Sequence, residues 1–243
     1  SFLKESGFIF TGADSQCLLL TDSKEKTKKV LLEHRIFTPN YAVISSSIDV
    51  SKIALDFPLM LKLEDRHSSV GITSENVVYN TEQLARVSQK LIDKYHANVL
   101  AEEFINGREY TVTIWGNGLE AKCIYITQES YLDPNVSKIN TESAKFIHGS
   151  KDENNLISVE LGSTEVKKKI GVTVLNSYKA LNFYDYGRFE VREKNGVYYV
   201  IDCNPNPWLG LNAVLFKGTK NLGYNFGETL LQICEFAVQR NIS

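Results

Sequence analysis

Apolar residues recur along this chain with two periods, one typical of helices and one typical of strands. Between residues 81 and 96 they lie three or four positions apart, as on the buried face of a helix, at Leu84, Val87, Leu91, Ile92 and Tyr95. Similar spacing predicts helices over about 164–181 and 227–239. A lysine-rich helix is expected from about residue 24 to His34, with Asp22 and Glu25 in a capping arrangement at its start.

Segments rich in β-branched and aromatic residues predict strands, which fall at 59–63, 70–80, 98–105, 108–116 and 120–127. Two Asn-Gly pairs are typical of tight turns, one at 106–107 and one at the centre of a hairpin over 187–204. The opening segment 8–12 (FIFTG) resembles the end of a strand. Residues 128–163 are rich in Asn, Ser, Asp and Gly and are expected to form a long functional loop. The mixture predicts an α+β fold.

Composition excludes several classes of function. The 243 residues carry 27 Lys and Arg against 29 Asp and Glu, so no basic excess supports a nucleic acid partner. No apolar run is long enough to span a membrane, and the opening residues SFLKESGFIF lack the basic start and following apolar run that are typical of a signal sequence. Four scattered cysteines, at 17, 123, 203 and 234, fit reduced thiols and a cytoplasmic location rather than a disulfide framework.

The hairpin over 187–204 carries the most informative chemistry. Arg188 and Glu190 alternate on one strand while Asp202 and Asn204 alternate on the next, so each pair shares a face. A turn with an odd number of residues would place Glu190 opposite Asp202. Such an oxygen cluster suits magnesium completed by phosphate oxygens, with manganese as the alternative ion. The plainer interpretation is a solvated hairpin face, but the apolar residues 198–201 indicate a buried strand.

A lysine inside an apolar strand provides the second signal. Lys62 lies within PLMLKL, where an inward ammonium would be costly unless it met an anion such as phosphate. An outward-facing lysine is the equally common alternative. Residues 67–71 (HSSVG) offer small side chains and backbone N–H groups that could cover phosphates, although alone this is a weak signal. Lys24 belongs to a lysine run of the kind that usually forms the wet face of a helix.

Four segments, in order, resemble the ATP-grasp superfamily, and in particular the D-alanine:D-alanine ligases. They are FTGADSQCLLLTDSKEKTK, LMLKLEDRHSSVGI, VLAEEFINGREYTV and DYGRFEVREKNGVYYVIDCNPNPWLG. The resemblance implies an ATP-grasp fold, in which two α+β subdomains with antiparallel sheets grip ATP between them. It divides the chain into a linker from a missing N-terminal domain (1–22), a central lid subdomain (23–105) and a C-terminal catalytic subdomain (106–243).

The resemblance also implies roles for individual residues. Lys24 and Lys62 would hold ATP phosphates beneath a loop of Ser68, Ser69, Val70 and Gly71. Adenine would contact Glu102, Glu103, Phe104 and Ile105 and pack on Ile201, and Glu109 would bind the ribose. Glu190, Asp202 and Asn204 would hold Mg²⁺. The catalytic residues would be Arg188, which faces the reacting carboxylate, and Lys145, which belongs to an active-site loop.

The implied function is ATP-dependent ligation of an amino acid or peptide carboxylate to an amine through an acyl phosphate. Ala213 falls where a serine of the family binds the second substrate's carboxylate, which argues against D-alanine here. His67, Leu63 and Glu103 are smaller departures. The alternatives are a catalytically silent nucleotide-binding module acting as a regulator or scaffold, and transfer of the acyl group to a thiol. The first-substrate domain could belong to another polypeptide, and homodimer formation is left open.

Overall fold

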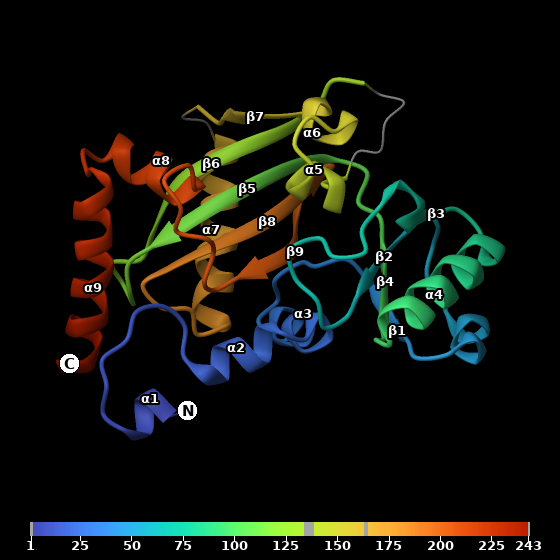
Figure 1. Cartoon of the computed structure of the whole chain (residues 1–243), viewed down its shortest axis with the longest axis horizontal. Coiled ribbons are helices and arrows are strands. Elements are labelled where there is room, and N and C mark those ends of the chain that lie inside the picture. The colour runs from blue at the N-terminus through green and yellow to red at the C-terminus, as the bar shows by residue number, and fades with distance from the viewer. Residues whose placement is uncertain (1, 134–138, 163–164, 243) are drawn as a thin grey trace.

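The computed structural model describes residues 2–133, 139–162 and 165–242 and contains two antiparallel sheets with helices on their faces (Figure 1). The helices are α1 (Phe2–Glu5), α2 (Ser15–Thr21), α3 (Lys24–Glu33), α4 (Thr81–Tyr95), α5 (Glu142–Phe146), α6 (Lys151–Asn155), α7 (Glu165–Ala180), α8 (Val214–Asn221) and α9 (Phe226–Ile242), with 3₁₀ turns η1 (Ser47–Lys52) and η2 (Ser74–Asn76). The strands are β1 (Tyr41–Ile44), β2 (Leu59–Leu63), β3 (Val77–Val78), β4 (Val99–Glu103), β5 (Arg108–Trp115), β6 (Lys122–Tyr131), β7 (Leu156–Glu160), β8 (Tyr186–Lys194) and β9 (Val197–Asn204).

The smaller sheet has the order β1-β4-β2-β3 and is covered on one face by α4 (Figure 1). The predicted apolar stripe of α4 is confirmed, since Leu84, Val87 and Leu91 pack in one buried cluster with alternate residues of β2. Because side chains alternate across a strand, Leu59, Leu61 and Leu63 face α4 and Lys62 lies on the opposite face. That face is turned towards the larger sheet.

The larger sheet has the order β7-β6-β5-β8-β9, and its two faces differ in chemistry. One face packs its apolar residues, among them Tyr110, Val112, Phe189 and Val191, with α7 into the main core. The other face is lined by the alternate, polar positions of β5, β8 and β9. At one end of the sheet α8 and α9 close over this polar face through Trp115, Tyr186 and Leu215.

The beginning of the chain differs from its predicted structure. Residues 8–12 form no strand. Phe10 instead packs against the guanidinium of Arg240, and Gly12, with φ +79°, donates its N–H to Asp185 at 2.7 Å. Within the predicted linker 1–22, α2 places Cys17 in the main core. The N-cap of α3 is Ser23 rather than Asp22, because the Ser23 hydroxyl accepts the N–H of Lys26.

The turn predicted at Asn106-Gly107 does not join a hairpin. β4 pairs with β1 and β2 in the smaller sheet, whereas β5 pairs with β6 and β8 in the larger one. The chain therefore crosses between sheets at residues 104–107, and Arg192 holds the crossing through a hydrogen bond to the carbonyl of Ile105 at 3.1 Å. The division into lid and catalytic subdomains at 105/106 stays a prediction.

Residues 128–163 are more ordered than their composition indicates. β6 continues to Tyr131, and α5, α6 and β7 follow in the described part of this stretch. The polar residues that favoured a loop act as helix caps, since the hydroxyls of Thr141 and Ser150 accept the N–H groups of Ala144 and Glu153. Likewise, the strand predicted over 70–80 is reduced to two residues that follow the capped turn η2.

The composition predicted reduced cysteines and no membrane-spanning segment. All four cysteines are free. Among the helices of residues 2–133, 139–162 and 165–242, none combines the length and apolar character that a bilayer crossing requires.

Candidate active site

A cleft lies between the two sheets and encloses about 740 Å³, its open mouth included. One wall comes from β2, β4 and the loop after β2, and the other from the polar face of β8 and β9. Most of the residues predicted to bind ATP line it: Lys24, Lys62, Ser68, Ser69, Val70, Glu102, Glu103, Phe104, Ile105, Glu109 and Ile201. The predicted metal ligands Glu190 and Asp202 line it too. Gly71 and Asn204 are not among the lining residues.

The deepest polar group of the cleft is the carboxylate of Glu102, which bridges two buried lysines. Its Oε1 lies 2.5 Å from Lys62 Nζ, and its Oε2 lies 2.7 Å from Lys28 Nζ. The predicted inward orientation of Lys62 is therefore observed, but the anion that offsets its burial is a carboxylate of the chain itself. Lys62 also donates to the carbonyl of Ile201 at 3.4 Å. A phosphate would be a further partner for an ammonium that is already held in place.

Burial and charge oppose each other at this cluster. Burial lowers the pKa of a lysine, but Glu102, Asp202 and Glu190 more than offset it and raise the pKa of Lys62 above its ordinary value. At Lys28 burial prevails and the pKa is lowered despite Glu102. Burial raises the pKa of a carboxyl, yet the ammonium groups of Lys28 and Lys62 hold the pKa of Glu102 below its usual range. The cluster thus keeps a cationic Lys62 beside the carboxylates of β8 and β9.

Glu190 and Asp202 lie directly opposite each other, as predicted, but the reason differs from the prediction. The turn at Asn195-Gly196 contains two residues, which alone would place Glu190 opposite Ile201. A β-bulge between Val191 and Glu190 makes Ile201 an extra residue and shifts the pairing by one. Val200 consequently faces the core, while Asp202 and Asn204 lie on the polar face of the sheet.

The cross-strand register aligns polar groups in rows. Thr111, Glu190 and Asp202 are direct neighbours across β5, β8 and β9. Thr113, Arg188 and Asn204 form the adjacent row. Since side chains of both rows share one face, the predicted metal ligands lie together on that face, with Glu190 and Asp202 lining the cleft and Asn204 in the adjacent row.

The donor set fits magnesium on the chemistry of its atoms. Glu190 and Asp202 bring two carboxylates face to face, an arrangement that is unfavourable without a nearby cation. Arg188 Nη2 lies 3.6 Å from Glu190 Oε1, and the buried ammonium of Lys62 also interacts with Glu190 and Asp202. Asn204 adds an amide oxygen that also accepts the N–H of Asn206 at 3.2 Å. Among the described residues no group of three or more His, Cys, Asp or Glu could hold a metal, so the set depends on this amide.

The carboxylate of Glu109 is fixed by the strand beside it. Its Oε2 accepts two hydrogen bonds from the buried guanidinium of Arg192, one of them at 3.0 Å from Nε. The hydroxyl of Tyr131 donates to the same oxygen at 3.4 Å. The Arg192 guanidinium in turn lies 4.7 Å from the centre of the Phe104 ring. Glu109 is therefore held with a defined orientation at the position predicted for ribose.

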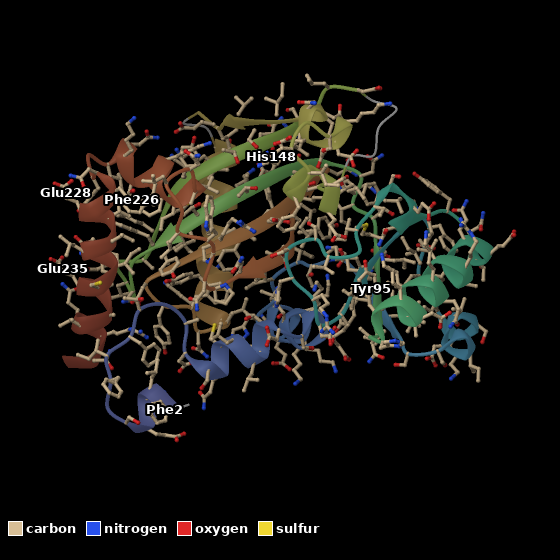
Figure 2. All side chains as sticks on the ribbon, viewed as in Figure 1. Phe2, Tyr95, His148, Phe226, Glu228 and Glu235 are labelled. Carbon is tan, nitrogen blue, oxygen red and sulfur yellow. The ribbon has the colours of Figure 1, made fainter. Side chains whose placement is uncertain are left out.

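The loop after β2 has an unusual backbone. Ser68 and Ser69 adopt left-handed conformations with φ of 60° and 59°, and Gly71 has φ +74°. Ser69 donates to the carbonyl of Asn140 at 3.0 Å, and Gly71 donates to Glu142 Oε2 at 2.9 Å. Tyr95, at the end of α4 (Figure 2), lies against Gly71, where an added Cβ would be 3.0 Å from its ring. The loop is thus tied to α5 across the mouth of the cleft.

The two predicted catalytic residues are Arg188, on β8, and Lys145, in α5. Arg188 lines a second pocket, which adjoins the predicted metal ligands and is formed with the segment after β9. The backbone of Lys145 belongs to α5, beside the loop after β2, but its side chain is outside the described residues.

Sequence reasoning missed three residues that complete this site. Lys28 follows Lys24 by one helical turn, a spacing that could have distinguished it within the lysine run. Arg192 continues the alternation of Arg188 and Glu190 along β8. Thr113 carried no local signal, since only the pairing of β5 with β8 places it beside Arg188.

The comparisons with known proteins agree with this geometry. The family model described as the D-ala D-ala ligase C-terminus matches residues 30–235. This chain belongs to that family. The predicted α+β, ATP-grasp fold and the predicted family are confirmed.

Curated ligase sequences match almost all of this chain. It is 24% identical to a D-alanine–D-alanine ligase A of Bacillus cereus over 98% of its length and 74% of that protein. It is 27% identical to the corresponding ligase of Clostridium perfringens over 99% of its length and 76% of that protein.

Two solved structures share the fold. A D-alanine–D-alanine ligase from Bacillus anthracis complexed with ATP superposes with a TM-score of 0.77 and 20% identity, covering 98% of this chain and 73% of that one. A D-Ala:D-Ser ligase from Enterococcus faecalis gives 0.78 and 19%, covering 96% and 66%.

Proposed function

We propose that this chain catalyses the ATP-dependent ligation of an amino acid or peptide carboxylate to an amine. The observation that carries the proposal is a single cleft in which cationic Lys62 faces the opposed carboxylates of Glu190 and Asp202. Such an arrangement of cations and oxygen ligands suits a nucleoside triphosphate with its metal ion. Family membership and a relative solved with ATP support the same interpretation.

In the first step, an oxygen of the substrate carboxylate attacks the γ-phosphorus of ATP, and the bond from that phosphorus to the ADP oxygen breaks. An acyl phosphate and ADP result. Lys24 and Lys62 hold phosphate oxygens from the side of the smaller sheet, and the loop of residues 68–71 covers them. Glu102 to Ile105 and Ile201 contact the adenine, while Glu109 accepts a hydrogen bond from a ribose hydroxyl.

In the second step, the amine nitrogen attacks the acyl carbon, the bond from that carbon to the phosphate oxygen breaks, and the proton of the amine passes to solvent. The products are an amide and inorganic phosphate. Arg188 faces the acyl oxygens and stabilises the negative charge that develops on them. No side-chain nucleophile is required.

Glu190, Asp202 and Asn204 would hold magnesium, which supplies positive charge to the phosphate oxygens when it is bound. The ligand set is hard and contains only oxygens, so magnesium is favoured and manganese is the second choice. Because Glu190 and Asp202 face each other, binding of a divalent cation would relieve their mutual repulsion.

The amine substrate need not be D-alanine. One structural neighbour is a D-Ala:D-Ser ligase, so this fold accommodates different second substrates. Ala213 has no side chain able to donate or accept a hydrogen bond at the position where the family's serine was expected. An apolar replacement there changes what the second pocket can bind.

Thermal unfolding with ATP in the presence and absence of Mg²⁺ tests the proposal. ATP at a hundredfold excess over its dissociation constant should stabilise the chain by about 2.7 kcal/mol, and only with the metal present. Lys62→Met should remove most of this shift, whereas Lys90→Met, at an exposed lysine of α4 paired with Glu75, should retain it. An ADP-release assay over pools of amino acids and dipeptides then detects turnover. Equal unfolding temperatures with and without Mg²⁺–ATP would refute the nucleotide site.

A further inference from the structure

A second pocket continues the polar face of the larger sheet beyond Arg188. It encloses about 570 Å³, open mouth included, and is covered by the segment between β9 and α8. Its lining residues are Thr113, Arg188, Pro207, Trp208, Asn212, Ala213, Val214 and Leu215. Since Arg188 and Asn204 are cross-strand neighbours, this pocket lies directly beside the predicted metal ligands.

Two features of the pocket favour an anionic group. Arg188 contributes a guanidinium to its wall. The eight-residue helix α8 begins there, and its first-turn residues Val214 and Leu215 line the pocket. The N-cap residue Ala213 makes no side-chain cap, so no side chain caps the N–H groups of Val214 and Leu215, whereas the N–H of Phe216 donates to the Ala213 carbonyl at 3.1 Å.

A buried hydroxyl supplies an independent indication of a ligand. Thr113 is 2% exposed, and its Oγ1 has no hydrogen-bond partner among the residues that the structure describes. An unsatisfied buried hydroxyl is costly, and it persists mainly where water or a ligand completes it. Thr113 lines the same pocket as Arg188 and is its direct neighbour across β5 and β8.

The remaining wall of the pocket is apolar, and it offers more apolar surface than the methyl side chain of an alanine substrate would cover. Trp208 lines the pocket although 69% of its surface is exposed, which leaves ring surface available to a ligand. The indole lies against Gly210, where an added Cβ would lie 1.7 Å from its Cζ2. A side chain at residue 210 would therefore displace the ring, which lines the pocket together with Pro207, Val214 and Leu215.

We propose that this pocket binds the amine substrate as an α-amino acid with a large apolar side chain, aromatic by preference. The inference rests on the proposed ligase function and adds the substrate class. The carboxylate of the amino acid lies between Arg188 and the first turn of α8, and the Thr113 hydroxyl provides a further polar partner. The side chain of the bound amino acid packs on the exposed indole ring of Trp208. Alanine or serine would leave this apolar wall exposed to water.

Equilibrium binding of individual amino acids tests this directly. Isothermal titration calorimetry is carried out on the chain preloaded with Mg²⁺ and a non-hydrolysable ATP analogue. The probes are phenylalanine, leucine and alanine, each as the D and the L enantiomer, and phenethylamine. Phenylalanine should bind at least about tenfold more tightly than alanine because it buries more apolar surface. Phenethylamine, which lacks the carboxylate, should bind at least about tenfold more weakly than phenylalanine.

Variants separate the apolar wall from overall folding. Trp208→Ala and Gly210→Ala should both abolish the preference for phenylalanine over alanine while leaving binding of the ATP analogue unchanged. Tyr79→Ala, at an aromatic residue 64% exposed on the smaller sheet, is the matched control and should keep the preference.

The outcomes distinguish this inference from the proposed function. If the ATP analogue binds but alanine binds as tightly as phenylalanine, or if Trp208→Ala keeps the preference, the substrate class is wrong and the ligase proposal stands. If no probe binds although the analogue does, the pocket is not an amino acid site. Failure of the analogue itself to bind in the presence of Mg²⁺ would overturn the ligase proposal.

Discussion

The nucleotide cleft and the pocket beside it share one sheet face but satisfy their polar groups in different ways. In the cleft, Glu102 pairs with two lysines and Glu109 pairs with Arg192, so the buried charges are offset within the chain. In the second pocket, the Thr113 hydroxyl has no partner within the described part of the chain, and the side chain of Ala213 does not cap its helix. The cleft is preorganised before any ligand arrives, whereas the second pocket contains polar groups that a ligand would satisfy.

This difference separates the requirements of a nucleotide site from those of a pocket that selects an amino acid. A site for ATP requires fixed charges at fixed places, and a paired cluster provides them at little reorganisation cost. A pocket that selects among amino acids is tuned by its apolar walls and by a few polar groups. Changes at Ala213 or Trp208, which line the second pocket and not the cleft, should therefore change what the pocket binds without disturbing the cleft.

The largest effect is expected in the cleft, at Glu190. Glu190→Gln keeps the shape of the side chain but removes one of the two opposed carboxylates, so metal-dependent ATP turnover should fall by about a thousandfold, or about 4 kcal/mol. ADP release measures it. Glu235→Gln, on α9 at the far end of the molecule from the smaller sheet (Figure 2), should retain full turnover. Undiminished turnover in Glu190→Gln would place the metal elsewhere.

Removing the charge that neutralises the cleft should cost stability. Glu102→Gln leaves Lys28 and Lys62 buried side by side without their carboxylate, which should lower the free energy of unfolding by about 3 kcal/mol. The neighbouring Glu103→Gln removes a charge but keeps an oxygen that can accept the hydrogen bond from Asn40, so it should change the free energy of unfolding by less than about 0.5 kcal/mol. Urea unfolding at pH 7 compares the two variants, and equal costs would show that the paired cluster does not stabilise the cleft.

The same cluster predicts a dependence on pH. Although burial opposes it, the two lysines hold the pKa of Glu102 below its ordinary value of 4.5. The carboxylate therefore contributes stability above pH 4.5, and this contribution is lost as pH falls through the lower folded-state pKa. Wild-type stability should decline more steeply than that of Glu102→Gln below pH 4.5. Parallel pH profiles would contradict the assigned direction.

A smaller effect is expected where the N-terminal segment contacts the residues beside the predicted metal ligand Asn204. Gly12 has φ +79°, and a Cβ there would lie 2.3 Å from Asn206 Oδ1, the atom that accepts the N–H of Ala13. Because of this backbone conformation and this contact, Gly12→Ala should destabilise the chain by about 2 kcal/mol. It should also raise the Mg²⁺ concentration needed for ATP binding, because the backbone N–H of Asn206 donates to the side chain of Asn204, a predicted metal ligand. Gly7→Ala, with φ +72° and no atom near the added Cβ, isolates the backbone contribution. Equal costs would exclude the contact with Asn206.

The smallest effect is expected in the second pocket, with the opposite sign. Thr113→Val replaces an unpartnered buried hydroxyl with a methyl group, so it should stabilise the ligand-free chain by about 1 kcal/mol. Thr229→Val removes a hydroxyl that donates to the carbonyl of Asn225 at 2.9 Å and should destabilise by about as much. Thermal unfolding decides the signs, and a destabilised Thr113→Val would mean that the hydroxyl is satisfied without a ligand.

The sequence alone determined the chemical character of the nucleotide cleft. The apolar stripe of α4 and the alternation along β2 and β8 are local patterns with periods that fix which side chains share a face. The order of the four segments then determined the family. Local periodicity is sufficient here because burial on one side of a helix or strand forces the polar residues to the other.

Only the tertiary structure decided how these faces meet. The bulge at Ile201, the crossing between sheets after β4 and the pairing of Glu102 with Lys28 each depend on contacts between residues far apart in the chain. Thr113 illustrates the reason most clearly, because a threonine in a strand has no special sequence signal. Its position beside Arg188 arises from the register of β5 against β8, which the summed packing of both strands determines.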